Sequence, residues 1–149
     1  MDVGQVAGAL AKGAVAGVAG TAAMTAAQAL EMRVTGREGS DVPGQVGERL
    51  SGYTPPDAAA RERLNTGVHW GHGIVNGGLR GLIGLTGASG AAATALHFGA
   101  VWTTDVTLYR TLGIAPPPWA WESSALGTDL LHKGVYAAVT GVVYERLDR

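Results

Sequence analysis

Long stretches without a charged side chain most strongly limit how this sequence can fold. Residues 13–30 and residues 81–104 contain no Asp, Glu, Lys or Arg. A helix needs about 20 mostly apolar residues to cross a hydrocarbon core of about 30 Å. In a soluble fold of this size, a helix such as residues 13–30 would have to bury nearly its whole circumference. The sequence therefore predicts helices that span a membrane.

Turn-forming residues divide the apolar sequence into four helices. Residues 86–90 interrupt the longer stretch, and residues 116–118 stop the chain again because proline lacks an amide hydrogen. The resulting fold class is all-α: a polytopic membrane protein that forms a single membrane domain over residues 1–149. Its four-transmembrane-helix bundle is expected to have helices at about 7–32, 64–86, 91–112 and 123–145.

A polar loop over residues 33–63 is the only sizeable connection that the sequence predicts. Glycine and proline punctuate it, and Ser40 and Asp41 before Pro43 suit the start of a short surface helix that ends near Leu50. This loop and the proline-rich connection hold six arginines, whereas three basic residues lie on the opposite side. Because basic loops stay cytoplasmic, we expect both termini outside.

The composition agrees with packed membrane helices and excludes several function classes. The chain has 24 glycines, and only 15% of its residues are charged. A net charge of -1 provides no basic surface for nucleic acid. The absence of cysteine excludes thiolate metal sites and cysteine nucleophiles. Ser123 and Ser124 lack the context of a nucleophile elbow, so we expect no enzyme.

Glycines at a spacing of four residues indicate close helix packing. Gly73, Gly77 and Gly81 form a stripe on the second predicted helix, and Gly13 and Gly17 form a pair on the first. Small residues four apart let a neighbouring backbone approach closely. The pattern predicts glycine- and alanine-rich packing between these helices.

Each predicted helix also carries a stripe of polar side chains. Ionisable groups in hydrocarbon usually face the bundle interior and find a partner there, so we expect the stripes to converge. For Arg80, we expect the long side chain to extend to the membrane interface instead. The candidate interior residues are His69, His72, Asn76, His97, Asp105, Asp129, His132 and Lys133.

Counting residues from the predicted turns suggests which side chains share a depth. The count places Asn76, His97, His132 and Lys133 in one inner cluster. It places His69 near Asp105, with Asp129 as a further member, closer to the polar loop.

Three functions fit a polar bundle core. In the first, the protein is a non-catalytic membrane or assembly module whose polar groups only fix packing, as isolated polar residues in membrane helices often do. In the second, the His, Asp and Lys side chains relay protons or small ions. In the third, His72 and His97 hold a haem between facing helices. No metal site is predicted. The expected partners are the lipid bilayer and other copies of the chain or a larger membrane complex.

The last part of the chain resembles a known bacterial family. The segment LGIAPPPWAWESSALGTDLLHKGVYAAVTGVVYERLDR is similar to the C-terminal end of the YagU-like inner-membrane proteins, whose activity is unassigned. The matching positions are Pro116, Pro117, Trp121, Asp129 and His132. The resemblance implies a multi-pass protein of the bacterial inner membrane and supplies no substrate.

Overall fold

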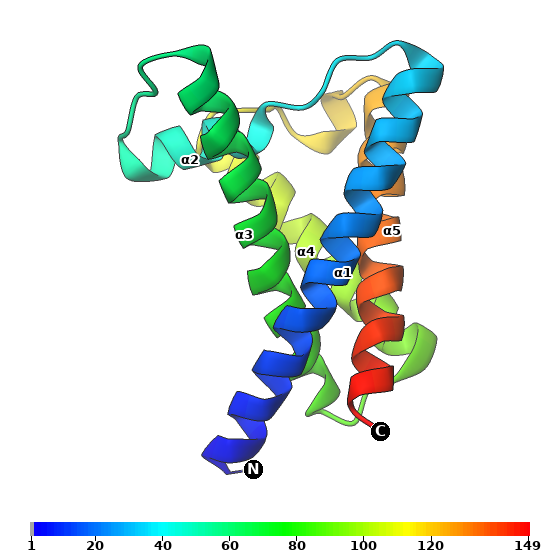
Figure 1. Ribbon diagram of the computed structural model, residues 1–149. Helices are drawn as coiled ribbons and strands as arrows, with labels where there is room; N and C mark the ends of the chain where they lie inside the picture. Colours follow the sequence, from blue (N-terminus) through cyan, green and yellow to red (C-terminus); the bar gives the residue numbers. More distant parts are fainter. Residues whose placement is uncertain (1) are drawn as a thin grey trace.

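The protein is all-α, as the sequence predicts. The computed structural model describes residues 2–149, and this range contains five α-helices, one 3-10 turn and no strand. Figure 1 shows the elements in chain order, which are α1 (Val3–Thr35), α2 (Val42–Ser51), α3 (Ala58–Gly84), α4 (Gly90–Thr111), η1 (Pro118–Ala120) and α5 (Ser123–Leu147).

The segment predicted as a polar loop over residues 33–63 is partly helical. It contains α2, which lies where Asp41 and Pro43 suggest a surface helix, and it contains the first turns of α3. The Asp57 side chain accepts a hydrogen bond of 2.7 Å from the Ala60 amide and so caps the start of α3. Gly36 and Gly52, both at φ 70°, end α1 and α2 in the left-handed conformation.

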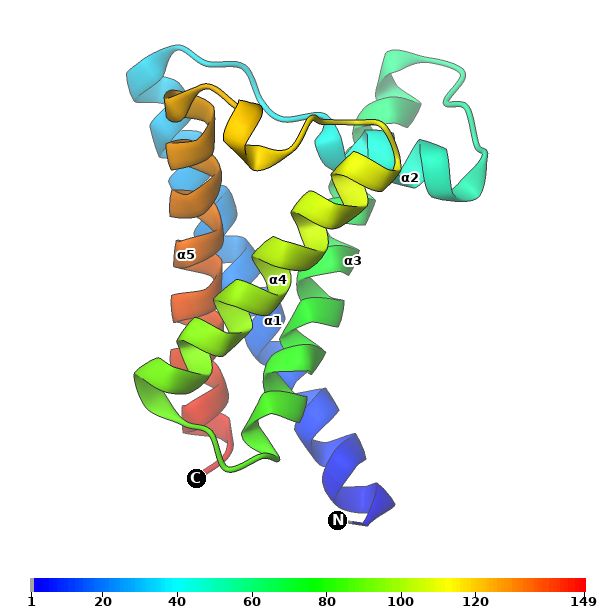
Figure 2. The same cartoon turned by 180° about the vertical axis from the view of Figure 1, so that it is seen from behind.

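The four long helices cross one another in two layers. Helix α1 packs against α3 and α5, and α4 packs against the same two helices from behind (Figures 1 and 2). Both termini and the α3–α4 turn lie at one end of the bundle. Helix α2, the loop that precedes it and η1 lie at the other end, where α3 and α5 diverge.

Glycines make the α1–α3 crossing close. A Cβ atom on Gly77 would lie 2.6 Å from the Cα of Gly17, and one on Gly13 would lie 3.0 Å from the Gly81 amide nitrogen. A Cβ on Gly73 would collide with the Thr21 hydroxyl. All five glycines that the sequence singles out therefore lie in this crossing, where the two backbones touch directly.

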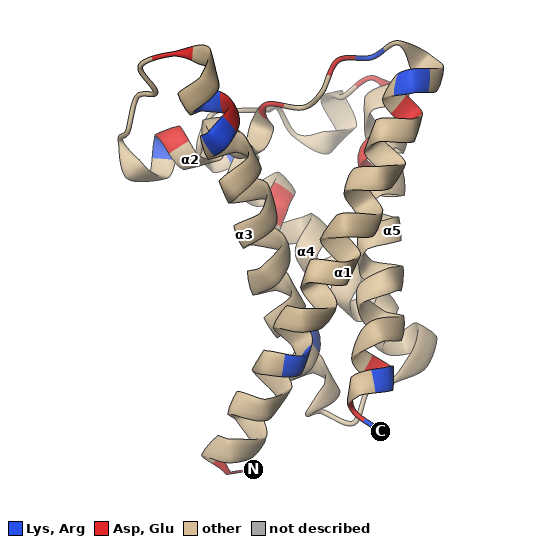
Figure 3. Cartoon of the chain, viewed as in Figure 1, with Lys and Arg blue, Asp and Glu red and all other residues tan. Residues whose placement is uncertain are grey.

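Several polar side chains are buried, and many large apolar side chains are exposed. The largest fully buried side chains include Arg80, His97 and Asp105, each 1% exposed or less. Large apolar side chains point outward at the same time, with Val75 73% and Leu96 58% exposed. Charged residues gather at the two ends of the bundle, and few lie between them (Figure 3).

Helix α1 is the one helix within residues 2–149 that is long and apolar enough to cross a membrane by itself. About a third of its most apolar part is buried, where it packs against α3 and α5. The prediction of a helical bundle is confirmed, whereas four membrane spans are not shown. Histidine, asparagine, arginine and lysine in α3 and α5 make these helices less apolar than α1.

Candidate functional site

Asp105 on α4 is the centre of the polar interior. Its side chain is 1% exposed, and its Oδ1 lies 2.7 Å from Nε2 of His72 on α3. Its Oδ2 lies 3.5 Å from Nζ of Lys133 on α5. Asp105 therefore connects three helices, which is the arrangement expected for a charge taken out of water.

Lys133 joins a second carboxylate to this group. The ammonium donates to Oδ1 of Asp129 one turn earlier on α5 and lies 5.4 Å from the centre of the Tyr109 ring. The other oxygen of Asp129 accepts a 3.0 Å hydrogen bond from the Trp102 indole. We call His72, Asp105, Asp129 and Lys133 the Asp105 cluster.

His97 and Asn76 meet deeper in the bundle. The Nε2 of His97 lies 2.8 Å from the backbone carbonyl oxygen of Asn76. The side-chain amide of Asn76 donates a 3.0 Å hydrogen bond to the backbone carbonyl of His72. Tyr136 stacks obliquely on His97 at 5.6 Å between ring centres and donates its hydroxyl to the Gly73 carbonyl at 2.6 Å. These contacts attach α4 and α5 to the glycine stripe of α3.

The expected grouping by depth is off by about one helical turn. Asp105 contacts His72 instead of His69, whose Nε2 lies 3.0 Å from the Thr25 hydroxyl on α1. Lys133 belongs with Asp105 and not with His97. His132 is buried beside Lys133, and within the described chain its Nε2 has no hydrogen-bond partner. Residue counting takes no account of the angles at which packed helices cross.

Arg80 forms an ion pair with Glu145 that the sequence pattern does not predict. The prediction that its side chain extends to an interface is wrong, since the side chain is 1% exposed. Its Nη2 lies 3.1 Å from Oε1 of Glu145 on α5, and its guanidinium carbon lies 4.7 Å from the centre of the Tyr144 ring. The same Glu145 oxygen accepts the Gly90 amide at the start of α4. One feature of the sequence points to a buried Arg80. It follows Asn76 by four residues and so lies on the same helix face as His69, His72 and Asn76.

The haem alternative concerns His72 and His97, and it stays a prediction. The Nε2 atoms of His72 and His97 lie against Asp105 and the backbone carbonyl of Asn76, respectively. Within residues 2–149, no group of three or more His, Cys, Asp or Glu residues is placed to hold a metal ion.

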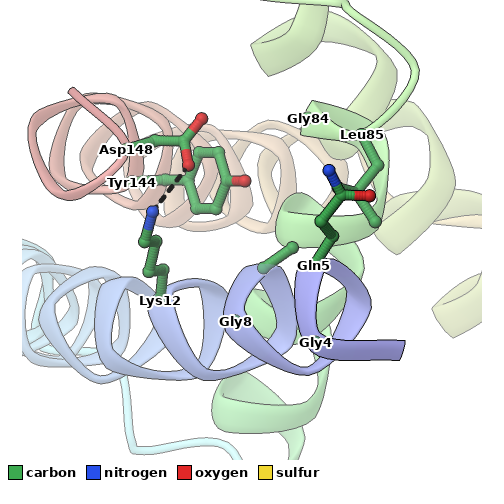
Figure 4. A pocket seen from close by; sticks show the side chains of 9 residues that line it. Gly4, Gln5, Gly8, Lys12, Gly84, Leu85, Tyr144 and Asp148 are labelled. Carbon is green, nitrogen blue, oxygen red and sulfur yellow. Dashed lines mark hydrogen bonds and ion pairs between the residues drawn. The ribbon is translucent and has the colours of Figure 1, made fainter. Parts of the chain in front are cut away.

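A separate cavity lies at the end of the bundle that carries the termini. It has a volume of about 690 Å³, and its lining includes Gly4, Gly8 and Tyr144 (Figure 4). Lys12 and Asp148 form a 3.0 Å ion pair across it. Both partners are about half exposed, so this pair contributes little to stability. The side chains of Gln5, Lys12, Tyr144 and Asp148 bring polar groups to its lining, and none of the Asp105 cluster residues belongs to it.

Comparisons with known proteins identify no relative: no family model, no curated protein and no solved structure matches this chain. The resemblance to YagU-like proteins therefore stays a prediction.

Proposed function

We propose that this chain is a multi-pass membrane protein whose buried polar groups hold four spanning helices together. The observation that supports this proposal is that Arg80, His97 and Asp105 are buried while Val75 and Leu96 are exposed. A bilayer favours this distribution, because lipid contacts apolar side chains at no cost and polar groups must find partners inside.

The spacing of charges along the helices supports the same proposal. On α1, Lys12 and Glu31 are separated by about 28 Å of uncharged helix at 1.5 Å per residue. On α3, Arg63 and Arg80 are separated by about 26 Å. Both lengths approach the thickness of a hydrocarbon core of about 30 Å. The arginine-rich end with α2 would then face the cytoplasm of a bacterial cell, as the resemblance also implies.

Within this frame, the function best supported is a non-catalytic membrane or assembly module. The buried polar groups mainly connect one helix to another: His72 joins α3 to α4, Tyr136 joins α5 to α3, and Arg80 joins α3 to α5. His69 reaches Thr25 and so ties α3 to α1. Such contacts fix which faces of the helices pack together.

Extraction of membranes with alkaline carbonate tests the membrane proposal. We expect the chain to remain in the pellet, because each of the four long helices exposes large apolar side chains. A loosely attached protein would move to the supernatant, and a monodisperse preparation without detergent would likewise reject the proposal.

A proton or small-ion relay is the second candidate. The observation that favours it is the continuous contact from Asp129 through Lys133 and Asp105 to His72, which joins titratable groups within the interior. The two ends of this series are partly exposed, with 24% of the Asp129 side chain and 36% of the His72 side chain accessible.

Flux measurements in proteoliposomes distinguish the two candidates. A relay predicts proton or ion flux above empty liposomes, lost in Asp105→Asn and retained in Lys12→Ala, whose exposed ion pair lies at the far end. The same flux measurement on His97→Ala and His132→Ala tests whether these two interior histidines belong to the relay. Wild-type protein that folds and shows no flux, with Asp105→Asn affecting only stability, would leave the packing function.

A further inference from the structure

Glycines of α1 leave space in the cavity at the end that carries the termini. Gly4 and Gly8 line it, and a Cβ atom on Gly8 would meet no atom of the surrounding structure within 4 Å. Farther along the same helix, Gly13 and Gly17 touch the backbone of α3 directly. The first glycines therefore open a space, whereas the later ones close a crossing. The volume of about 690 Å³ is typical of small-molecule sites, which span about 300–1,000 Å³.

Two opposite charges line this cavity, and both can form further hydrogen bonds. Nζ of Lys12 lies 3.0 Å from Oδ1 of Asp148. Within residues 2–149, this is the one hydrogen bond of an ammonium that has three donors, and Oδ2 of Asp148 accepts none. The two side chains are 42% and 49% exposed, so a ligand that enters the cavity can reach both of them.

Tyr144 and Gln5 add neutral polar groups to the cavity walls. The Tyr144 hydroxyl donates to the Gly81 carbonyl at 3.4 Å, which is longer than a usual hydrogen bond. A Cβ atom on Gly84 would lie 2.6 Å from this hydroxyl, so the glycine leaves room for it. Figure 4 shows Tyr144 beside the ion pair and Gln5 on the opposite side of the cavity.

The lining carries one positive and one negative side chain. Among residues 2–149, no Lys, Arg, Asp or Glu other than Lys12 and Asp148 belongs to it. Arg80 lies 4.7 Å from the centre of the Tyr144 ring, but it is paired with Glu145. A ligand with a single charge would attract one partner of the exposed pair and repel the other. A ligand that carries both charges close together can match both partners.

We propose that this cavity binds a zwitterion with a phosphodiester and a primary ammonium, the headgroup chemistry of phosphatidylethanolamine. The phosphate would lie at Lys12 and the ammonium at Asp148, because hydrogen bonds between oppositely charged groups are the strong ones. The ion pair is exposed and weak, so its side chains can turn toward the ligand at little cost. The site goes beyond the proposed function, and only a lipid source of the zwitterion rests on the membrane arrangement.

Binding is measured on the full chain in detergent at neutral pH. Calorimetric titration with glycerophosphoethanolamine tests the free zwitterion, and native mass spectrometry with phosphatidylethanolamine tests the lipid. Each is compared with its glycerol analogue, glycerophosphoglycerol or phosphatidylglycerol, which keeps the phosphodiester and lacks the ammonium. We expect one zwitterion per chain, bound about tenfold more tightly than the analogue, because the analogue lacks one charged hydrogen bond.

Gly8→Leu tests the position of the site. Leucine would fill the cavity without a collision at its Cβ, so we expect the helices to persist and the zwitterion to be lost. Gly71→Leu is the matched control, since Gly71 also faces open space and does not line the cavity. This control should bind like the wild type, and circular dichroism checks that both variants keep their helices.

Asp148→Asn tests the charge pattern and keeps the experiment decisive if Gly8→Leu fails to fold. The half-exposed Asp148 ends α5, and its loss leaves Lys12 as the one charged group of the lining. We expect the zwitterion to bind about tenfold more weakly, whereas the glycerol analogue binds at least as well as before. A purely structural role of Asp148 would weaken both ligands alike.

The source of the zwitterion follows from which form binds. Binding of glycerophosphoethanolamine shows that the site needs no acyl chain, and binding of the lipid alone shows that the headgroup comes from the bilayer. Failure of both forms to bind would overturn the proposal, as would equal binding of the glycerol analogues or undiminished binding in Gly8→Leu. Carbonate extraction is independent of these outcomes, so a chain that it releases and that binds the free zwitterion would reject the membrane proposal and retain the site.

Discussion

Replacing Gly77 by leucine is expected to prevent α1 and α3 from packing. Even a Cβ at this position would lie 2.6 Å from the Cα of Gly17 and 2.8 Å from its amide nitrogen, so the two backbones would have to separate. A collision with backbone cannot be relieved by a change of rotamer. We expect the free energy of unfolding in detergent to fall by more than about 3 kcal/mol, the upper end of usual overpacking costs.

Gly71→Leu is the matched control for this experiment. Gly71 lies on the same helix and is exposed, and a Cβ atom added there would meet no other atom within 4 Å. Leucine favours a helix more than glycine does, so this variant should be as stable as the wild type or slightly more stable. Equal effects of the two substitutions on the unfolding transition would contradict a close crossing at Gly77.

The second large effect is expected for Glu145→Gln. This change removes the only carboxylate that contacts Arg80 within residues 2–149 and leaves a guanidinium that is 1% exposed without a counter-charge. Removal of one partner from a buried ion pair typically costs about 3–5 kcal/mol. The loss should appear as a lower midpoint of unfolding in detergent.

Arg80→Met provides the comparison that identifies the cause. Methionine keeps much of the volume of the arginine stem and removes the charge, and replacement of a buried charge by an apolar side chain is often tolerated. Glu145 would still accept the Gly90 amide and is 34% exposed. We therefore expect Arg80→Met to be clearly more stable than Glu145→Gln. The reverse order would show that Arg80 stabilises the fold mainly through other contacts.

The sequence predicts the long helices well because their signals are local. Charge-free length, the turn at residues 86–90 and the three prolines lie within the segments that they define. The glycine spacing is also local, and it identifies the residues of the α1–α3 crossing. Helix α3 begins earlier than predicted because Asp57, which caps it, lies among residues that look like loop.

The partners within the polar interior are harder to predict, because they depend on how helices cross. A shift of one turn along α3 exchanges His69 for His72 as the partner of Asp105. The sequence suggests an interface for Arg80 because its partner, Glu145, lies 65 residues later in a helix end that resembles a solvated terminus. Spacing within one helix identifies the face, and only the three-dimensional packing identifies the contact.

The order of synthesis gives the last helix a special role. The ribosome releases α3 and α4 before α5, and domains generally form from the N-terminal end during synthesis. Arg80 and Asp105 are therefore synthesised before the helix that supplies Glu145 and Lys133. A nascent chain therefore lacks these two partners of Arg80 and Asp105 until α5 has been made and has packed.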